Sequence, residues 1–284
     1  MSEWNLKDYK QMWYHHMMEE VVYPEDKVDI LMEKLIEKHR NKQLDEREIM
    51  KLFGEEVDTK YMREFWKIRT QQHKINEGMT NLEDDMELLR LKLQKEIPKM
   101  VSYVNPNKDM HMLDLGSGYG TWTFFFANNV KHIDAVDYTK ELVDVGIQRM
   151  RSENITNIDF CCNSIQQFIS AKKYDMILLS GICIYLNDAD IKKLMKHIND
   201  YTKKGSIIVL RDGTGLNDKY IISKEYSERL KSMYSAMYRT REEYIDIFKS
   251  IGFELIKDED MFEEGSPLNR YKETRLRIYK FRKA

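Results

Sequence analysis

A glycine-rich run near the middle of the chain has the residue types and spacing to hold a small anionic or nucleotide-like ligand. It reads Asp114-Leu115-Gly116-Ser117-Gly118-Tyr119-Gly120 and lies between an apolar segment and a helical one. Glycines there permit a tight turn and let a ligand approach the backbone closely. The helix start adds free N–H groups and a positive dipole end. Thr121 stands where the dinucleotide fingerprint needs a glycine, so the pattern is G-x-G-x-G.

An acidic residue ends the next apolar segment, His132–Asp137. In an open parallel sheet, Asp137 would fall at the same edge as the glycine turn, where an acid can accept both ribose hydroxyls of an adenosine-containing ligand. Two plainer alternatives remain at this point. Asp137 could cap the following helix, and the glycine turn could be an ordinary strand-to-helix connection.

The elements that would position these residues alternate strictly after the turn at residues 105–108. The expected strands are His111–Leu115, His132–Asp137, Ile155–Cys161, Tyr174–Ser180 and Ser206–Leu210. The expected helices are Thr121–Asn128, Thr139–Glu153, Ser164–Ser170 and Asp188–Thr202. Such alternation implies parallel strands joined by right-handed crossovers. The sequence therefore predicts an α/β, doubly wound, Rossmann-like sheet.

The C-terminal part predicts how this sheet ends. Thr240-Arg241-Glu242-Glu243 is a capping-box signature that opens a helix running to about Ser250. Two further strands, Phe253–Lys257 and Arg275–Phe281, follow without room for a helix between them, so they should pair antiparallel. We therefore expect seven strands, mostly parallel, with an antiparallel last strand.

The region before residue 105 is helical in composition, which predicts two domains, 1–104 and 105–284. Its first residues include an aromatic cluster with two adjacent histidines, His15 and His16. One hypothesis is a helical lid that closes over the ligand and brings a histidine to the substrate. The other is an oligomerisation or partner-docking element, consistent with a homodimer.

Composition excludes several classes of function. The formal net charge is −2 and the basic residues are scattered, so no surface for nucleic acid is expected. The longest nearly apolar run, 176–186, is short of the roughly 20 residues that a membrane span needs. A polar N-terminus argues against a signal peptide and for a cytoplasmic protein. The three cysteines lack metal-binding spacing, and no H-E-x-x-H follows the histidines, so no metal is expected.

With these motifs in place, residues 112–281 resemble the class I S-adenosylmethionine-dependent methyltransferases. The resemblance implies S-adenosylmethionine as cofactor, with its methionine part at the glycine turn, its ribose at Asp137, and its adenine beside Tyr138. The adenine edge would meet the segment containing Ser164 and Ile165, although this family usually has Asp where Ser164 stands. The implied cofactor-binding residues are Asp114, Gly116, Ser117, Gly118, Gly120, Asp137, Tyr138, Ser164, Ile165 and Ser180.

Two closer resemblances concern the acceptor of the methyl group. Segments 65–69, 80–83, 185–188 and 238–244 together are similar to methyltransferases associated with bacterial surface-polysaccharide synthesis. Separately, residues 160–162 and 211–213 resemble protein α-N-terminal methyltransferases, in which an acid after the fifth strand assists deprotonation of an amine. The length of the N-terminal region departs from that second family.

Methyl transfer from a sulfonium needs alignment and exclusion of water, and an oxygen or amine acceptor also needs a general base. The loops after the fourth and fifth strands should face the transferred methyl group. Asp212 is the first candidate for the base, with Tyr185 as a second catalytic residue; Asp212 could instead cap the next segment. Arg211 could bind a substrate carboxylate or phosphate, or form a structural ion pair.

A tyrosine-rich segment from Tyr220 to Tyr238 should cover the substrate side. Its tyrosines, Tyr238 included, could form a pocket wall or meet the sulfonium by cation–π contact, or simply pack as a core. Four residues are thus expected to bind substrate: Arg211, Tyr238, His15 and His16. The leading functional hypothesis is methylation of a small-molecule or carbohydrate-like acceptor at oxygen. The alternatives are methylation of an amine, including a protein N-terminus, and binding of the cofactor without catalysis.

Overall fold

The computed structural model describes residues 57, 59–72, 85–227, 230 and 232–284. Two compact units divide the chain into Met1–Glu56 and Val57–Ala284, and all described residues belong to the second unit. Helices α4 (Thr59–Gln72) and α5 (Met86–Val104) are part of this second unit together with the sheet. His15 and His16 lie outside the described residues, so their proposed roles stay predictions.

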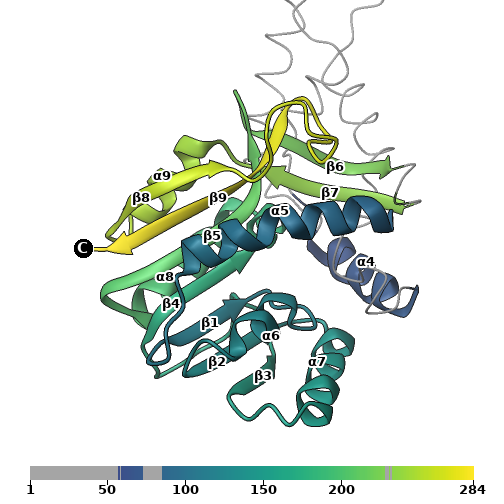
Figure 1. Ribbon diagram of the computed structural model, residues 1–284. Helices are drawn as coiled ribbons and strands as arrows, with labels where there is room; N and C mark the ends of the chain where they lie inside the picture. Colours follow the sequence, from purple (N-terminus) through teal and green to yellow (C-terminus); the bar gives the residue numbers. More distant parts are fainter. Residues whose placement is uncertain (1–56, 58, 73–84, 228–229, 231) are drawn as a thin grey trace, which may run out of the picture. The chain divides into compact units, whose positions relative to one another are not determined.

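A seven-stranded sheet forms the centre of the unit, in the order β3-β2-β1-β4-β5-β9-β8 (Figure 1). Neighbouring strands from β3 to β5 pair parallel, and β9 runs antiparallel to both β5 and β8. This confirms the predicted doubly wound sheet and its antiparallel last strand. The strands are β1 (His111–Leu115), β2 (His132–Asp137), β3 (Ile158–Cys162), β4 (Tyr174–Ser180), β5 (Thr202–Gly215), β8 (Phe253–Asp260) and β9 (Thr274–Lys283).

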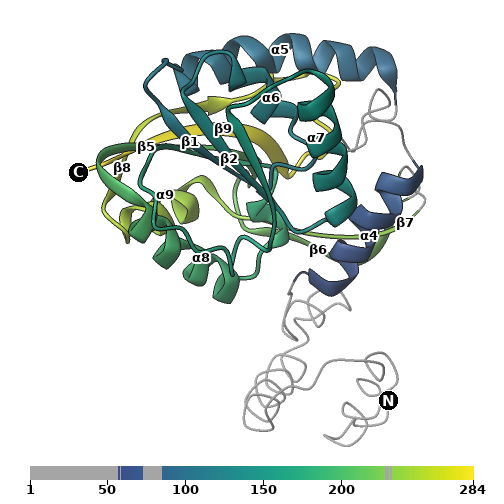
Figure 2. The same cartoon turned by 90° about the horizontal axis from the view of Figure 1, so that it is seen from below.

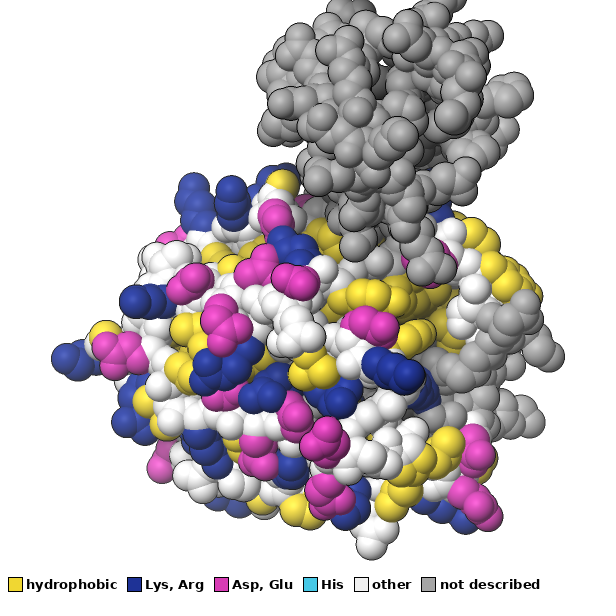
Figure 3. Space-filling view, turned by 90° about the horizontal axis from the view of Figure 1, so that it is seen from above, with side chains coloured by type: hydrophobic (Ala, Val, Ile, Leu, Met, Phe, Trp, Pro, Cys, Tyr) yellow, Lys and Arg dark blue, Asp and Glu magenta, His cyan; other side chains and the backbone are white. Residues whose placement is uncertain are grey.

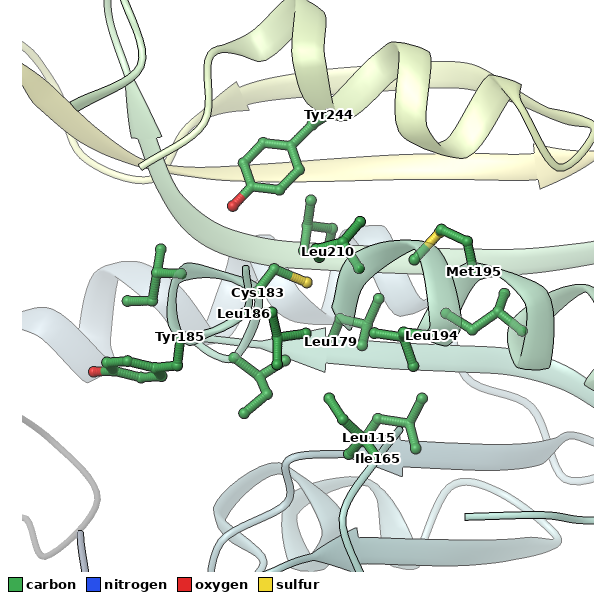
Figure 4. Close-up of a cluster of buried hydrophobic side chains, with 14 of the residues drawn as sticks. Leu115, Ile165, Leu179, Cys183, Tyr185, Leu186, Leu194, Met195, Leu210 and Tyr244 are labelled. Carbon is green, nitrogen blue, oxygen red and sulfur yellow. The ribbon is translucent and has the colours of Figure 1, made fainter. Parts of the chain in front are cut away.

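Helices cover both faces of this sheet (Figure 2). One face carries α5, α6 (Thr121–Ala127) and α7 (Lys140–Ser152), and the other carries α8 (Asp188–Tyr201) and α9 (Arg241–Lys249). The central strands β1 and β4 are almost entirely buried, because helices cover both faces of the sheet there. On the α8 side, the core contains Leu115, Leu179, Leu194 and Tyr244 (Figure 4).

The helix expected over Ser164–Ser170 is wrong, because the chain forms only one turn there. The Ser164 carbonyl accepts the N–H groups of both Gln167 and Phe168, at 3.0 and 2.9 Å, and no further helical hydrogen bond follows. Ser170 then bonds the N–H of Lys172 through its hydroxyl. The first turn of a helix is unfavourable to form, and a short segment adds too few further hydrogen bonds to compensate. Here side-chain hydrogen bonds and the buried Ile165 stabilise an irregular turn instead.

The tyrosine-rich segment forms a two-stranded antiparallel sheet that the sequence analysis missed. Strands β6 (Tyr220–Ser227) and β7 (Ser232–Tyr238) pair with each other, separately from the main sheet. Strand β5 also continues to Gly215, five residues beyond the expected end at Leu210. Aromatic and β-branched residues are enriched in strands, and the tyrosines and isoleucines of this segment carried that signal.

Candidate active site

A cavity of about 270 Å³ opens at the carboxyl edge of the sheet, where β1, β2, β4 and β5 end. Ligands bind at this edge in open α/β sheets, where the strand order reverses. The residues that line this cavity include Trp66, Lys92, Glu96, Asp114, Ser117, Asp137, Tyr138, Ser180, Tyr185, Arg211, Asp212 and Tyr238. The cavity thus brings together most of the predicted cofactor residues and every predicted acceptor-side residue that the structure describes.

The glycine turn lines this cavity with backbone rather than side chains. Gly116, Gly118 and Gly120 all have positive φ, at +80°, +58° and +94°, a conformation that other residues rarely adopt. The N–H of Gly116 donates to the Val136 carbonyl at 2.8 Å, which ties the turn to β2. Gly116 and Gly118 line the cavity, as predicted for residues that let a ligand come close.

Gly120 is not among the lining residues, so its predicted contact with the cofactor stays a prediction, and the structure gives it a packing role. A Cβ at this position would lie 2.9 Å from ring atoms of Phe124 and Phe160. The missing side chain therefore allows these two rings to pack beneath the start of α6. Gly120 supports the turn by close packing between helix and sheet, which is one of the known uses of glycine in such motifs.

Two buried carboxylates flank the turn. Asp114 accepts a hydrogen bond from the Thr123 hydroxyl at 2.6 Å, and burial raises the pKa of Asp114 to about 7. Asp137 accepts the N–H of Gly118 through Oδ2 at 3.0 Å and that of Thr139 through Oδ1 at 2.8 Å. Burial raises the pKa of Asp137 as well. Thr139 is the N-cap of α7, so Asp137 is not the cap residue of that helix.

Unpartnered polar atoms around the turn fit a polar cofactor. Within the described part of the chain, five buried side-chain N or O atoms have no hydrogen-bond partner, and three of these belong to residues that line this cavity: Ser117 Oγ, Thr121 Oγ1 and Arg211 Nε. Buried polar groups in proteins are nearly always hydrogen-bonded. These atoms and the two carboxylates match a ligand that carries amine, carboxylate and ribose groups.

The predicted adenine residues separate into two groups. Tyr138 lines the cavity, and its hydroxyl donates to the Met62 carbonyl of α4 at 3.5 Å. Ser164 and Ile165 are buried but lie outside the lining residues, and Ile165 packs into the hydrophobic core (Figure 4). Their predicted contact with the cofactor remains a prediction. Ser180, at the end of β4, lines the cavity as expected.

Asp212 joins the cavity to the loop after β4. Its carboxylate accepts the N–H of Cys183 at 2.7 Å and that of Gly213 at 2.9 Å. It is fully buried, and burial raises its pKa to about 7 against the lowering effect of these hydrogen bonds. Cys183 begins the short 3₁₀ helix η2 (Cys183–Tyr185), so Asp212 also anchors the element that carries Tyr185. A pKa near neutrality suits a general base.

Arg211 is held by an ion pair with Glu96 of α5, and both side chains are buried. Its other terminal nitrogen lies 3.3 Å from the Ser180 hydroxyl. The structural ion pair that the sequence left open as an alternative is therefore present. Arg211 Nε has no hydrogen-bond partner, and the residue lines the cavity.

Aromatic rings form one wall of the cavity. The hydroxyls of Tyr185 and Tyr234 lie 3.0 Å apart, and Tyr238 lines the same wall. Figure 4 shows Tyr185 at the margin of the core, with its hydroxyl directed away from it. The ring of Trp66 meets that of Tyr185 edge-on, with centroids 5.8 Å apart. Trp66 comes from α4 and was missed as a site residue, because nothing in its local sequence indicates which cavity it reaches.

Arg239 is a second residue that the sequence analysis did not single out for the site. It is almost fully buried, and its guanidinium donates to the carbonyls of Cys183 and Leu186 at 3.1 and 2.8 Å. It also pairs with Asp188 at 2.7 Å. Asp212 thus holds the N–H side of η2 and Arg239 holds its carbonyl side. Together they fix where Tyr185 lies.

A separate group of potential metal ligands lies at the opposite, amino edge of the sheet. His132, Asp134 and Asp159 bring ligand atoms within 4.8 Å of one another. Lys172 already bonds both oxygens of Asp134, at 2.7 and 2.9 Å. The ammonium group neutralises this acid, and the group is remote from the cavity described above.

Charged and apolar surfaces agree with the composition. On the face shown in Figure 3, Lys and Arg side chains intermingle with Asp and Glu. Among the described residues, no helix is both long enough and apolar enough to cross a membrane.

The fold and the site define a class: a Rossmann-like protein with a cofactor cavity at the carboxyl edge and a buried acid beside it. Residues 106–261 match the family described as a methyltransferase domain, and the chain belongs to this family. The chain therefore contains a class I S-adenosylmethionine-dependent methyltransferase domain, with S-adenosylmethionine as its cofactor.

Individual relatives are distant. A phosphoethanolamine N-methyltransferase of Triticum aestivum is 22% identical over 165 residues, covering 57% of this chain and 32% of the relative. This chain spans about a quarter to a third of the length of the curated relatives it matches.

Two solved structures share the fold. The Haemonchus contortus phosphoethanolamine N-methyltransferase 1, in complex with phosphoethanolamine and S-adenosylhomocysteine, has a TM-score of 0.61 at 14% identity. The structural match covers 78% of this chain and 48% of the Haemonchus contortus chain. A methyltransferase of Leishmania major has a TM-score of 0.59 at 16% identity, covering 79% and 82%.

Proposed function

We propose that this methyltransferase acts on the nitrogen of a small amine that also carries an anionic group. The observation that carries the proposal is the pairing of a buried carboxylate with an aromatic wall in one cavity: Asp212 beside Tyr185, Tyr238 and Trp66. Aromatic faces attract ammonium groups by cation–π interaction, most strongly when water is excluded. A neutral hydroxyl acceptor gains nothing comparable from such a wall.

The anionic part of the acceptor is suggested by basic residues around the same cavity. Lys92 of α5, Arg211 of β5 and Arg270 of the loop before β9 line it, and Arg211 is already paired with Glu96. Lysine and arginine are the usual partners of phosphate and carboxylate groups. The curated relatives are named for phosphoethanolamine, an amine with a phosphate at its other end. This agreement makes phosphoethanolamine the first compound to test.

The cofactor supplies a methyl group on a positively charged sulfur, which leaves as a neutral thioether. The protein must bind the acceptor as an ammonium ion and then remove one proton so that nitrogen has a lone pair. In this proposal the Asp212 carboxylate takes that proton, since its pKa of about 7 is matched to the task. Tyr185 and Tyr238 orient the amine, and Trp66 excludes water from the reacting atoms.

Oxygen methylation, the leading hypothesis from the sequence, remains the competing proposal. It would use the same Asp212 as base and would draw on the phenol hydroxyls of the tyrosine wall to orient a sugar or alcohol. The two proposals therefore differ in the acceptor atom and share the base.

A matched pair of acceptors separates them. With radiolabelled S-adenosylmethionine, we expect methyl transfer to 2-aminoethyl phosphate and none to 2-hydroxyethyl phosphate, which differs only in the acceptor atom. Ethanolamine, which lacks the phosphate, should react with a KM at least about tenfold higher, because a charged contact contributes 1.5 kcal/mol or more. Transfer to the hydroxyl compound or to sugars, with none to amines, would overturn the proposal.

A further inference from the structure

Asn187 makes an unusual pair of hydrogen bonds to one distant residue. Its Oδ1 accepts the backbone N–H of Val57 at 2.7 Å, and its Nδ2 donates to the Val57 carbonyl at 3.1 Å, across 130 residues of sequence. Both residues are buried. Because the two bonds engage both backbone groups of a single residue, they fix the position and the direction of the chain at Val57.

Because its side chain bonds Val57, Asn187 does not cap helix α8 with that side chain. Asn187 is the N-cap residue of α8, where an asparagine side chain normally accepts a backbone N–H of the helix that it begins. Here its side chain makes no capping bond. The amide is instead committed to Val57, so the contact with α4 is what this side chain provides.

Helix α4 starts two residues after Val57 and places aromatic rings on the acceptor side of the cavity. Phe65 is buried, and its ring meets that of Tyr234 with centroids 6.1 Å apart. Trp66 lies beside Tyr185 in the cavity wall. The Tyr61 hydroxyl lies 3.0 Å from that of Ser232 at the start of β7.

Asn187 lies close after η2, the element that carries Tyr185, whose ring contacts that of Trp66. It follows Tyr185 of η2 by two residues, and η2 is itself held by Asp212 and Arg239. The two neighbouring rings of the aromatic wall, Trp66 on α4 and Tyr185 on η2, are therefore also connected through the Val57–Asn187 pair.

We propose that Asn187 is a positioning residue for the acceptor half of the active site: it holds α4 through Val57 so that Trp66 completes the aromatic wall beside Tyr185. The proposal concerns α4 and the acceptor, whereas the predicted cofactor residues Asp114 and Asp137 are held by Thr123, Gly118 and Thr139. It deepens the amine hypothesis, since a cation needs the closed aromatic wall. Its first test, however, needs no acceptor.

Hydrogen exchange measures the docking of α4 directly. In Asn187→Ala, the backbone amides of residues 59–72 should exchange at least about tenfold faster than in the wild-type chain, because two buried hydrogen bonds are lost. Asn187→Asp keeps the acceptor for the Val57 N–H and loses the donor to its carbonyl, so its exchange should be intermediate. This second variant keeps the test valid if the alanine variant folds poorly.

Asn157→Ala is the matched control. The Asn157 amide also bonds the backbone, donating to the carbonyls of Ala127 and Val130 at 2.8 and 3.3 Å, but at the amino edge of the sheet. This variant should lose stability without faster exchange in α4. Equal α4 exchange in the Asn187→Ala and Asn157→Ala variants would overturn the proposal.

A kinetic measurement separates positioning from general destabilisation. For an accepted amine, Asn187→Ala should lower kcat/KM about 10- to 100-fold, as misplacement of a substrate-orienting group does. Its affinity for S-adenosylhomocysteine, measured by calorimetry, should stay within about twofold of wild type. If affinity for the product cofactor falls as much as kcat/KM, Asn187 does not act on the acceptor half. If no amine reacts while α4 exchange behaves as expected, the amine hypothesis fails and the positioning role stands.

Discussion

The carboxylate of Asp137 reaches from the end of β2 to the glycine turn, where its Oδ2 accepts the N–H of Gly118 at 3.0 Å. This contact joins the two motifs that lie about twenty residues apart in the sequence. It means that Asp137 shapes the turn as well as facing the cavity. The acid predicted to bind ribose and the glycine turn therefore form one hydrogen-bonded unit.

Replacing Asp137 should weaken cofactor binding more than its ribose contact alone would suggest. Asp137→Ala removes an acceptor for ribose and also frees the Gly118 N–H, so we expect S-adenosylhomocysteine to bind at least about tenfold more weakly, since bonds to charged groups contribute about 1.5–3 kcal/mol. Isothermal calorimetry measures this directly. Asp159→Asn, an exposed acid on the neighbouring strand, is the control and should bind normally. Unchanged affinity in Asp137→Ala would show that the ribose lies elsewhere.

The rate should depend on pH through Asp212. Burial raises the pKa of this carboxyl to about 7, so at lower pH it is protonated and cannot accept a proton from the acceptor. At saturating substrates, kcat should rise about tenfold per pH unit up to about 7 and then level off. Asp212→Asn should abolish this rise and lower kcat by about 10²-fold or more. A pH profile that persists in the variant would exclude Asp212 as the base.

The same burial predicts how stability without cofactor depends on pH. Asp114 and Asp212 have pKa values of about 7 in the folded chain against an ordinary value of 3.8. The folded state therefore binds more protons than the unfolded state between these values, so stability falls as pH rises from about 4 to about 7. Urea unfolding at several pH values measures the slope. Asp114→Asn should reduce it, and an unchanged slope would contradict the assignment.

Breaking the buried ion pair of Glu96 and Arg211 should be costly. Glu96→Gln leaves the guanidinium charge buried without its counter-ion, and removal of one partner of a buried pair typically costs about 3–5 kcal/mol. The exposed pair formed by the adjacent Lys95 with Glu263, 3.2 Å apart, offers a matched control. Glu263→Gln should cost less than about 1 kcal/mol. Equal losses in chemical unfolding would mean that solvent screens both pairs alike.

Two glycines with similar φ test the packing role of Gly120. Gly120 and Gly205 have φ of +94° and +84°, but an added Cβ meets Phe124 and Phe160 at 2.9 Å only at Gly120. Both alanine variants carry backbone strain, while Gly120→Ala adds overpacking of about 1–3 kcal/mol. Thermal unfolding should therefore show a lower Tm for Gly120→Ala. Similar Tm values in both variants would indicate that the rings move aside freely.

The sequence predicted the features that depend on residues close together in the chain. The turn at 114–120, the acid at Asp137 and the alternation of strands and helices each follow from residue spacing, so the sheet was predicted correctly, and most of the predicted cofactor residues line one cavity at its edge. The segment at 164–170 was predicted wrongly, because a helix and a single turn share the same few local signals. The hairpin of β6 and β7 was missed although its aromatic and β-branched residues indicated strands.

Only the tertiary structure shows which residues come together in the proposed acceptor half of the site. Trp66, Asn187 and Arg239 belong to segments that the chain brings together over long sequence distances, and no periodicity links them. The partner of Arg211 was equally undecided, since Glu96 lies on a helix 115 residues away. Cofactor binding rests on backbone geometry that short motifs encode, and the acceptor pocket rests on side chains that meet only after the sheet and its helices have packed.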